Sequence, residues 1–183
     1  MSEKRPWVNF PHIWKSESAF MTFLRGAIRQ SVWNRYPIKL EFIKKNRKKI
    51  DNPNPKGRVA KVCGGTCYLC HKDFVQNDLQ VDHIKGNFQL KKIEDRQSFV
   101  EGLTLLTTED LAFVCKPCHT IKSYSERYSI SFEEARLRKE VIKFSKESVE
   151  NQLAILAEYG YTGSVVSNAT KRKSLFEEVL NNG

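Results

Sequence analysis

The sequence contains no stretch that approaches the roughly 20 uncharged apolar residues of a membrane-spanning helix, so it argues against a spanning segment. Its first ten residues, MSEKRPWVNF, also lack the apolar run of a secretory signal. It has neither an internal repeat nor a low-complexity tract. We therefore expect a cytoplasmic protein without a membrane partner, whose five cysteines stay reduced and serve as metal ligands or buried thiols.

Acidic residues are scarce in the first third of the chain, and this scarcity produces its positive charge. Residues 1 to 62 contain 15 Lys and Arg against 4 acids, which gives +11, whereas residues 63 to 130 give −1 (8 against 9) and residues 131 to 183 give zero (8 against 8). Such an excess favours a polyanionic partner, although a solvated surface would have the same composition. The aromatic residues within it could stack on bases or pack in a core.

Local patterns predict two helices in this basic third. Ser16 or Ser18 is a suitable N-cap for a helix over residues 19–33, and a second helix is expected over residues 37–50. Residues 51–58 have the composition of a loop, which we interpret as a boundary or linker. The second helix has the densest positive charge, and its predicted contacts to nucleic acid are Lys44, Lys45, Arg47, Lys48 and Lys49.

Short strands and turns are expected from Val62 to about Thr120, with an inserted helix around Asp95 to Leu103. Ser131 has the spacing of a capping box with Glu134 and begins a long predicted helix through Leu156. A last helix is expected over residues 171–180. These elements predict three parts. Residues 1–58 form a basic helical extension that binds DNA, residues 59–130 form a core that contains the candidate site residues, and residues 131–183 form a C-terminal helical extension.

Two Cys-x-x-Cys pairs give the most specific signal in the sequence. Cys67 with Cys70 and Cys115 with Cys118 can each present two sulfurs from a tight turn, and four sulfurs suit the tetrahedral coordination of structural zinc. Redox pairs or fortuitous pairs are the alternatives, but neither pair has the strand-helix-strand context of a redox motif. Cys63 could replace Cys67 as a ligand, but its spacing is less usual, so we interpret it as a bystander thiol.

An acid and an imidazole stand side by side between these pairs. Asp82 and His83 interrupt a short strand-like run, and His119 directly follows the second pair. A zinc ion held by the four cysteines is expected to bring these three residues close together. Asp82 and His119 can then hold a catalytic Mg²⁺ or Mn²⁺, and His83, which strand alternation directs away from Asp82, can be the general base that takes a proton from water. Each residue alone would more often be structural.

In this order the motifs resemble the HNH endonucleases of the ββα-metal fold, in the zinc-bearing form common among phage and bacterial proteins. That family has a Cys-x-x-Cys pair, an Asp-His pair, an Asn before a strand, and Cys-x-x-Cys-His. The matching residues, within about residues 63 to 125, are Cys67, Cys70, Asp82, His83, Asp110, Cys115, Cys118 and His119.

The resemblance implies a function and a fold. It implies a phosphodiester hydrolase acting on double-stranded DNA, encoded by a phage and working in the host cytoplasm, with His83 as base. Asp82 and His119 would hold the catalytic metal, and the four cysteines a structural zinc. The expected fold is α+β, with mainly helical flanks around a small ββα-metal core. No pattern in the sequence indicates an oligomeric state.

One residue departs from the family pattern. Asp110 occupies the position of the Asn, which in the family fixes the loop and orients the base histidine by hydrogen bonding. An Asp keeps the acceptor but loses the amide donor, so we expect Asp110 to support His83 as an acceptor. Two alternatives stay open: a non-catalytic zinc-knuckle protein that binds nucleic acid through its basic third, and a nuclease scaffold that has lost its activity.

Overall fold

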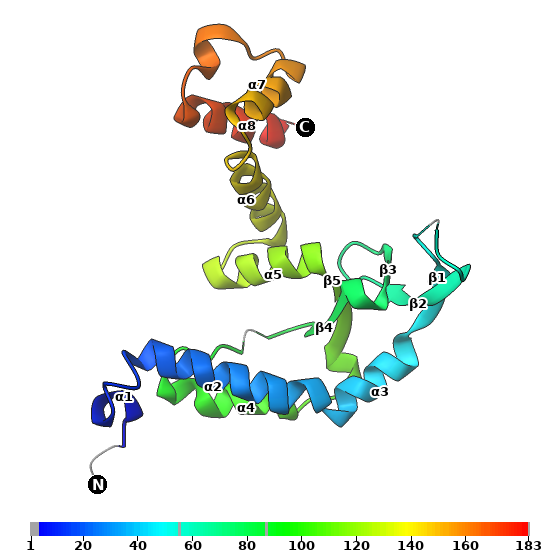
Figure 1. Ribbon diagram of the computed structural model, residues 1–183, viewed down its shortest axis with the longest axis vertical. Helices are drawn as coiled ribbons and strands as arrows, with labels where there is room; N and C mark the ends of the chain where they lie inside the picture. Colours follow the sequence, from blue (N-terminus) through cyan, green and yellow to red (C-terminus); the bar gives the residue numbers. More distant parts are fainter. Residues whose placement is uncertain (1–3, 55, 87, 183) are drawn as a thin grey trace. The chain divides into compact units, whose positions relative to one another are not determined.

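The structure, a computed structural model, describes residues 4–54, 56–86 and 88–182. This part of the chain is α+β, as the sequence predicts, with eight α-helices and two small antiparallel sheets (Figure 1). The helices are α1 (Pro6–Asn9), α2 (Glu17–Ser31), α3 (Pro37–Asn46), α4 (Arg96–Thr104), α5 (Lys116–Tyr128), α6 (Phe132–Phe144), α7 (Val149–Glu158) and α8 (Ala169–Asn182). The strands are β1 (Lys48–Asp51), β2 (Lys61–Thr66), β3 (Asp73–Val75), β4 (Leu79–His83) and β5 (Leu111–Cys115).

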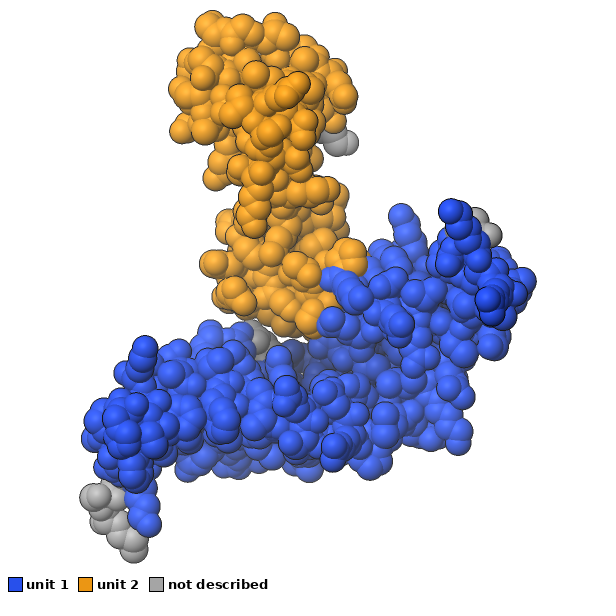
Figure 2. Space-filling view, viewed as in Figure 1, with its two compact units in different colours: residues 1–116 blue, residues 117–183 orange. Residues whose placement is uncertain are grey.

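The chain forms two compact units, residues 1–116 and 117–183 (Figure 2). The predicted boundary at residue 58 lies within the first unit, in the loop that joins β1 to β2. Among the described residues, every helix is too short or too polar to cross a lipid bilayer.

Helix α2 begins at a cap that the sequence predicts. The Ser16 side chain accepts a hydrogen bond from the Ala19 backbone N–H at 3.2 Å. Met21, Leu24 and Ile28 then recur at helical spacing, which gives α2 one apolar face. This face packs in a core cluster with the residues of α4 and its preceding loop, Leu90, Phe99 and Leu103. The predicted inserted helix is therefore confirmed as α4, and it supplies the surface on which α2 lies (Figure 1).

The second predicted helix is shorter than expected. Helix α3 ends at Asn46, and residues 48–51 form β1, which pairs antiparallel with β2. Ile50 lies opposite Val62 and is buried, with 8% of its surface exposed. Pairing with β2 and burial of Ile50 outweigh the local helix propensity of this lysine-rich stretch. The loop over residues 51–58, interpreted as a linker, instead connects two strands of one sheet.

The two sheets are small and separate. β2 is the central strand of the first sheet, in the order β1-β2-β3. The second sheet is the hairpin-like pair β4-β5, whose register places Leu79 opposite Cys115 at one end and His83 opposite Leu111 at the other. Every residue of β5 is buried, and α5 begins at the residue after it. From β4 to α5 the chain thus runs strand, helix, strand and helix, because α4 is inserted between the two paired strands.

The second unit is helical. Ser131 caps α6 by accepting a hydrogen bond from the Glu134 N–H at 3.1 Å, as predicted. The long helix expected through Leu156 is in fact two helices, because Ser148 accepts a hydrogen bond from the Asn151 N–H and caps α7 anew. A core cluster of Phe144, Leu156 and Val166 holds these helices together with residues of α8.

Two glycines provide a matched test of the α2–α4 packing. A β-carbon at Gly26, on α2, would meet no atom within 4 Å, whereas one at the buried Gly102, on α4, would overlap the Phe88 ring. Gly26→Ala should therefore raise the free energy of unfolding by about 1 kcal/mol through helix propensity. Gly102→Ala should lower it by about 1–3 kcal/mol through overpacking. Urea denaturation measures both, and shifts of the same sign would contradict the packing described.

Candidate functional site

The four cysteines of the two Cys-x-x-Cys pairs form one cluster. Cys67 and Cys70 lie in the turn between β2 and β3, Cys115 ends β5, and Cys118 lies in the first turn of α5. Their four sulfur atoms all lie within 4.8 Å of one another. A tetrahedral zinc site with Zn–S near 2.3 Å requires sulfur atoms about 3.8 Å apart, and the Cys70 and Cys115 sulfurs are 3.9 Å apart. The cluster therefore fits a metal ion such as zinc.

The protein around Cys67 favours its thiolate. The side chain is fully buried, and the Cys115 backbone N–H donates a hydrogen bond to its sulfur at 3.3 Å. Burial alone raises the pKa of the Cys67 thiol, but hydrogen bonds from the backbone of Cys115, Cys70 and Leu69 and from the Cys70 side chain lower this pKa to about 7. A metal-binding cysteine needs this ionised form. Cys63, on β2, lies outside the cluster formed by the described residues.

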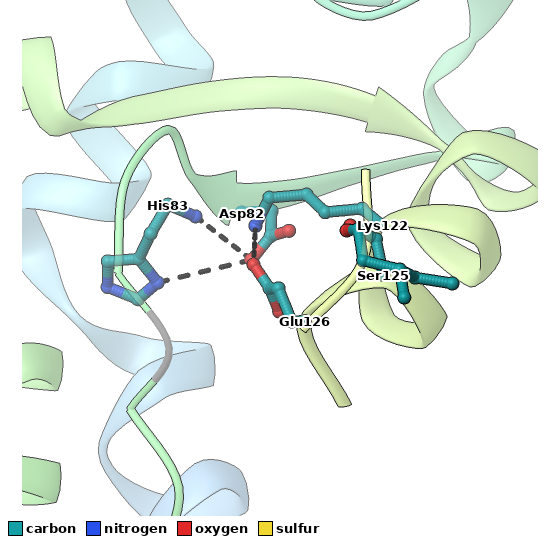
Figure 3. A network of polar contacts seen from close by, with 6 residues as sticks. Asp82, His83, Lys122, Ser125 and Glu126 are labelled. Atoms are coloured by element: carbon teal, nitrogen blue, oxygen red, sulfur yellow. Dashed lines mark hydrogen bonds and ion pairs between the residues drawn. The ribbon is translucent and has the colours of Figure 1, made fainter. Parts of the chain in front are cut away.

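Asp82 and His83 end strand β4 at the opposite end of the hairpin (Figure 3). Asp82 Oδ1 accepts a hydrogen bond from the His83 backbone N–H at 2.9 Å and lies 4.0 Å from His83 Nδ1. Strand alternation alone would direct the two side chains apart, and that expectation is wrong here. The carboxylate folds back to the next backbone N–H, and this brings it close to the imidazole.

The His83 ring is held by two aromatic residues that the sequence did not indicate as partners. Trp33, in the short 3-10 helix η1 (Trp33–Arg35), stacks on it with ring centroids 5.0 Å apart and planes at 20°. Phe88 meets it edge-on at 5.4 Å. The imidazole Nε2 is buried, so Nδ1 is the ring nitrogen that faces the Asp82 carboxylate. Only the abundance of tryptophan in the basic third signalled Trp33, since its contact with His83 spans a long separation in sequence.

Asp110 uses its carboxylate to fix the loop before β5. Its Oδ2 accepts hydrogen bonds from the Thr107 backbone N–H at 2.7 Å and from the Thr107 hydroxyl at 2.9 Å, across the 3-10 helix η4 (Thr108–Asp110). These bonds, and then the positive field of His83, lower the Asp110 pKa. The Asp110 carbonyl in turn accepts the Ile84 N–H at 2.8 Å, which joins this loop to the residue after His83. Both side-chain bonds need only an acceptor, which an Asp provides.

The role of Asp110 as an acceptor can be tested with two substitutions. Asp110→Asn keeps a side-chain oxygen for the Thr107 bonds and should leave the free energy of unfolding within about 0.5 kcal/mol of the parent, whereas Asp110→Ala removes it and should lower this free energy by about 1–2 kcal/mol. Urea denaturation of the two variants measures the difference. Equal losses in both would show that the negative charge, not the acceptor, is what matters.

The remaining predicted residues lie on three elements and on the one residue between two of them. His119 follows Cys118 in the first turn of α5. Lys44 and Lys45 are on α3, Arg47 follows it, and Lys48 and Lys49 are on β1, so the five basic residues do not share one helix.

All five basic residues are exposed. Lys45 pairs with Glu41 at 3.5 Å and Lys48 with Asp73 at 2.8 Å. Lys44, Arg47 and Lys49 form no ion pair with any residue that the structure describes. These three cations are therefore the most available to an outside anion.

Comparisons with known proteins identify no relative of this chain. No protein-family model, no curated protein and no solved structure matches this chain. The functional interpretation accordingly rests on the motifs of the sequence and on the geometry given above.

Proposed function

We propose that this protein is a metal-dependent DNA endonuclease of the HNH type, which hydrolyses phosphodiester bonds through a water molecule activated by His83. The observation that carries the proposal is the β4-β5 pair. One end of it carries the cysteine cluster and the other carries Asp82 and His83, with Asp110 beside them. The paired strands β4 and β5 and the helix α5 have the order of a ββα-metal core, with α4 inserted between the two strands.

The length of β4 would keep the metal of the cysteine cluster apart from a catalytic metal beside His83. From Leu79, opposite Cys115, to His83 the strand advances roughly 13 Å at about 3.4 Å per residue. A metal in the cysteine cluster is therefore too far from His83 to share its substrate. Its role is structural: it would hold the ends of the strands and leave the chemistry to Asp82, His83 and His119.

The surroundings of His83 suit a general base. Trp33 and Phe88 fix the ring plane, and the burial of Nε2 leaves Nδ1, on the side of Asp82, as the nitrogen that would accept a proton from water. An imidazole has the right basicity for this transfer near neutral pH. The Asp82 carboxylate beside it would stabilise the imidazolium that forms.

The proposed ligands of the catalytic cation are Asp82 and His119. A carboxylate oxygen is a ligand that Mg²⁺ and Mn²⁺ prefer, and an imidazole nitrogen suits Mn²⁺ as well. A divalent cation at this position would neutralise charge that develops on the phosphate during hydrolysis. Asp82 would thus have two roles. It would be a ligand of the cation, and it would orient His83, because its carboxylate accepts a hydrogen bond from the His83 backbone and faces the His83 ring.

The partner in this proposal is double-stranded DNA. The first 62 residues carry +11 of charge, and Lys44, Arg47 and Lys49 are exposed within them. Contacts from such side chains to phosphates give affinity that falls with salt and is independent of base sequence.

Incubation with supercoiled plasmid tests the proposal. The purified protein should convert the plasmid to nicked or linear forms when Mg²⁺ or Mn²⁺ is added, and should leave it intact without a divalent cation. Binding of the plasmid without cleavage under either metal would overturn the nuclease proposal and favour a zinc-knuckle protein that only binds nucleic acid.

A further inference from the structure

The second half of α2 leads to a stripe of three residues, of which the proposed function uses only Trp33. Arg25, Arg29 and Trp33 follow one another at intervals of four, and Val32 keeps helical backbone angles up to η1. Side chains at this spacing lie along one face of a helix. A different face, that of Met21, Leu24 and Ile28, packs in the core. Trp33 also packs against this core, so the core packing holds the Trp33 end of the stripe in place.

The stripe leads to Asp82 and His83. Its last member, Trp33, stacks on the His83 ring at 5.0 Å. Its middle member, Arg29, lies close enough to Asp82 for the carboxylate to act on it electrostatically. The Arg29 guanidinium thus lies near the pair of residues that would carry out hydrolysis, and Arg25 lies one helical turn farther from them along α2.

No close polar contact of the side chain explains the position of either arginine. Within the described residues, neither Arg25 nor Arg29 makes a side-chain hydrogen bond, or an ion pair within 4.0 Å. Partial burial and the like charge of Arg25 lower the Arg29 pKa, and Asp82 offsets this only in part. Like charges at this helical spacing repel each other, and a bound anion would relieve the repulsion. The planar guanidinium fork matches the geometry of a phosphate group.

We propose that Arg25 and Arg29 form a phosphate-binding site on α2 that holds a phosphodiester group of DNA beside His83. This inference rests on the proposed nuclease function and extends it, because it places the backbone of the substrate on α2 as well as on the exposed lysines of α3 and β1. The site would fix the phosphate next to the base, whereas those lysines would bind more distant phosphates.

DNA binding without cleavage tests this site. A short labelled duplex is titrated with protein in the absence of Mg²⁺ and Mn²⁺ over a range of NaCl concentrations. Arg25→Gln/Arg29→Gln should weaken the Kd about 10- to 100-fold and reduce the slope of log affinity against log salt by about 1–2. Arg35→Gln/Arg96→Gln removes the same charge from exposed positions of the same unit, and its Kd should change by less than about three-fold.

The outcomes separate this proposal from the nuclease proposal. Equal Kd values and salt slopes for the two double variants, with zinc content and thermal transition like those of the parent, would overturn the phosphate site. A parent protein that never cleaves plasmid, yet loses affinity only when Arg25 and Arg29 are changed, would overturn the nuclease and leave the phosphate site supported. In a cleaving protein, Arg25→Lys/Arg29→Lys should retain the salt slope but lose about 10-fold in cleavage, because lysine lacks the planar fork.

Discussion

Replacing Cys67 by serine should release bound zinc and unfold the strands around it, whereas replacing Cys63 should do neither. A structural zinc site contributes about 10 kcal/mol or more of folding free energy at neutral pH, and a domain of this size has only about 5–15 kcal/mol in total. Cys67 is fully buried within the cluster of four sulfurs, while Cys63 lies outside it on β2. The two thiols are only four positions apart, which makes the comparison a close one.

Metal analysis and thermal denaturation measure this difference. The parent and Cys63→Ser should each carry about one tightly bound zinc per chain and unfold cooperatively. Cys67→Ser should carry almost none and lose the cooperative transition of the first unit, as should the parent after prolonged chelation, whereas the helical second unit has a core of its own. A Cys67→Ser variant with the stability of the parent would show that the cysteine cluster is not a structural metal site.

Replacing His83 by alanine should lower DNA cleavage by about 1,000-fold, the usual contribution of a general base. The variant should keep its zinc and its affinity for DNA, because His83 lies at the far end of β4 from the cysteines. Imidazole added to the buffer should restore part of the rate, since the substitution leaves a ring-sized space between Trp33 and Phe88. His12→Ala, at an exposed position of the same unit, is the matched control and should cleave like the parent. A purely structural His83 would not respond to imidazole.

Local signals in the sequence predicted the helix caps and the cysteine cluster. Ser16 and Ser131 cap the helices expected of them, because a cap depends only on the next three residues. The cysteine cluster was likewise predictable, since each pair brings its two sulfurs together in a single turn and the metal supplies a reason for the pairs to meet.

Contacts between distant segments set the features that the sequence did not predict. The end of α3 depends on residues 61–64, which pair with β1 and turn a lysine-rich helical pattern into a strand. The orientation of His83 depends on Trp33 and Phe88, neither of which is marked as its partner by local spacing. The approach of Asp82 to His83 involves a hydrogen bond to the backbone, which strand alternation does not anticipate.

The direct test of the proposed chemistry is the rate at which the parent and His83→Ala nick supercoiled plasmid in the presence of Mg²⁺ or Mn²⁺. Both proteins should be loaded with zinc and shown to bind the plasmid equally. We expect rapid nicking by the parent and a rate about 1,000-fold lower for the variant. Equal rates would contradict the role of His83 as the base at the end of β4.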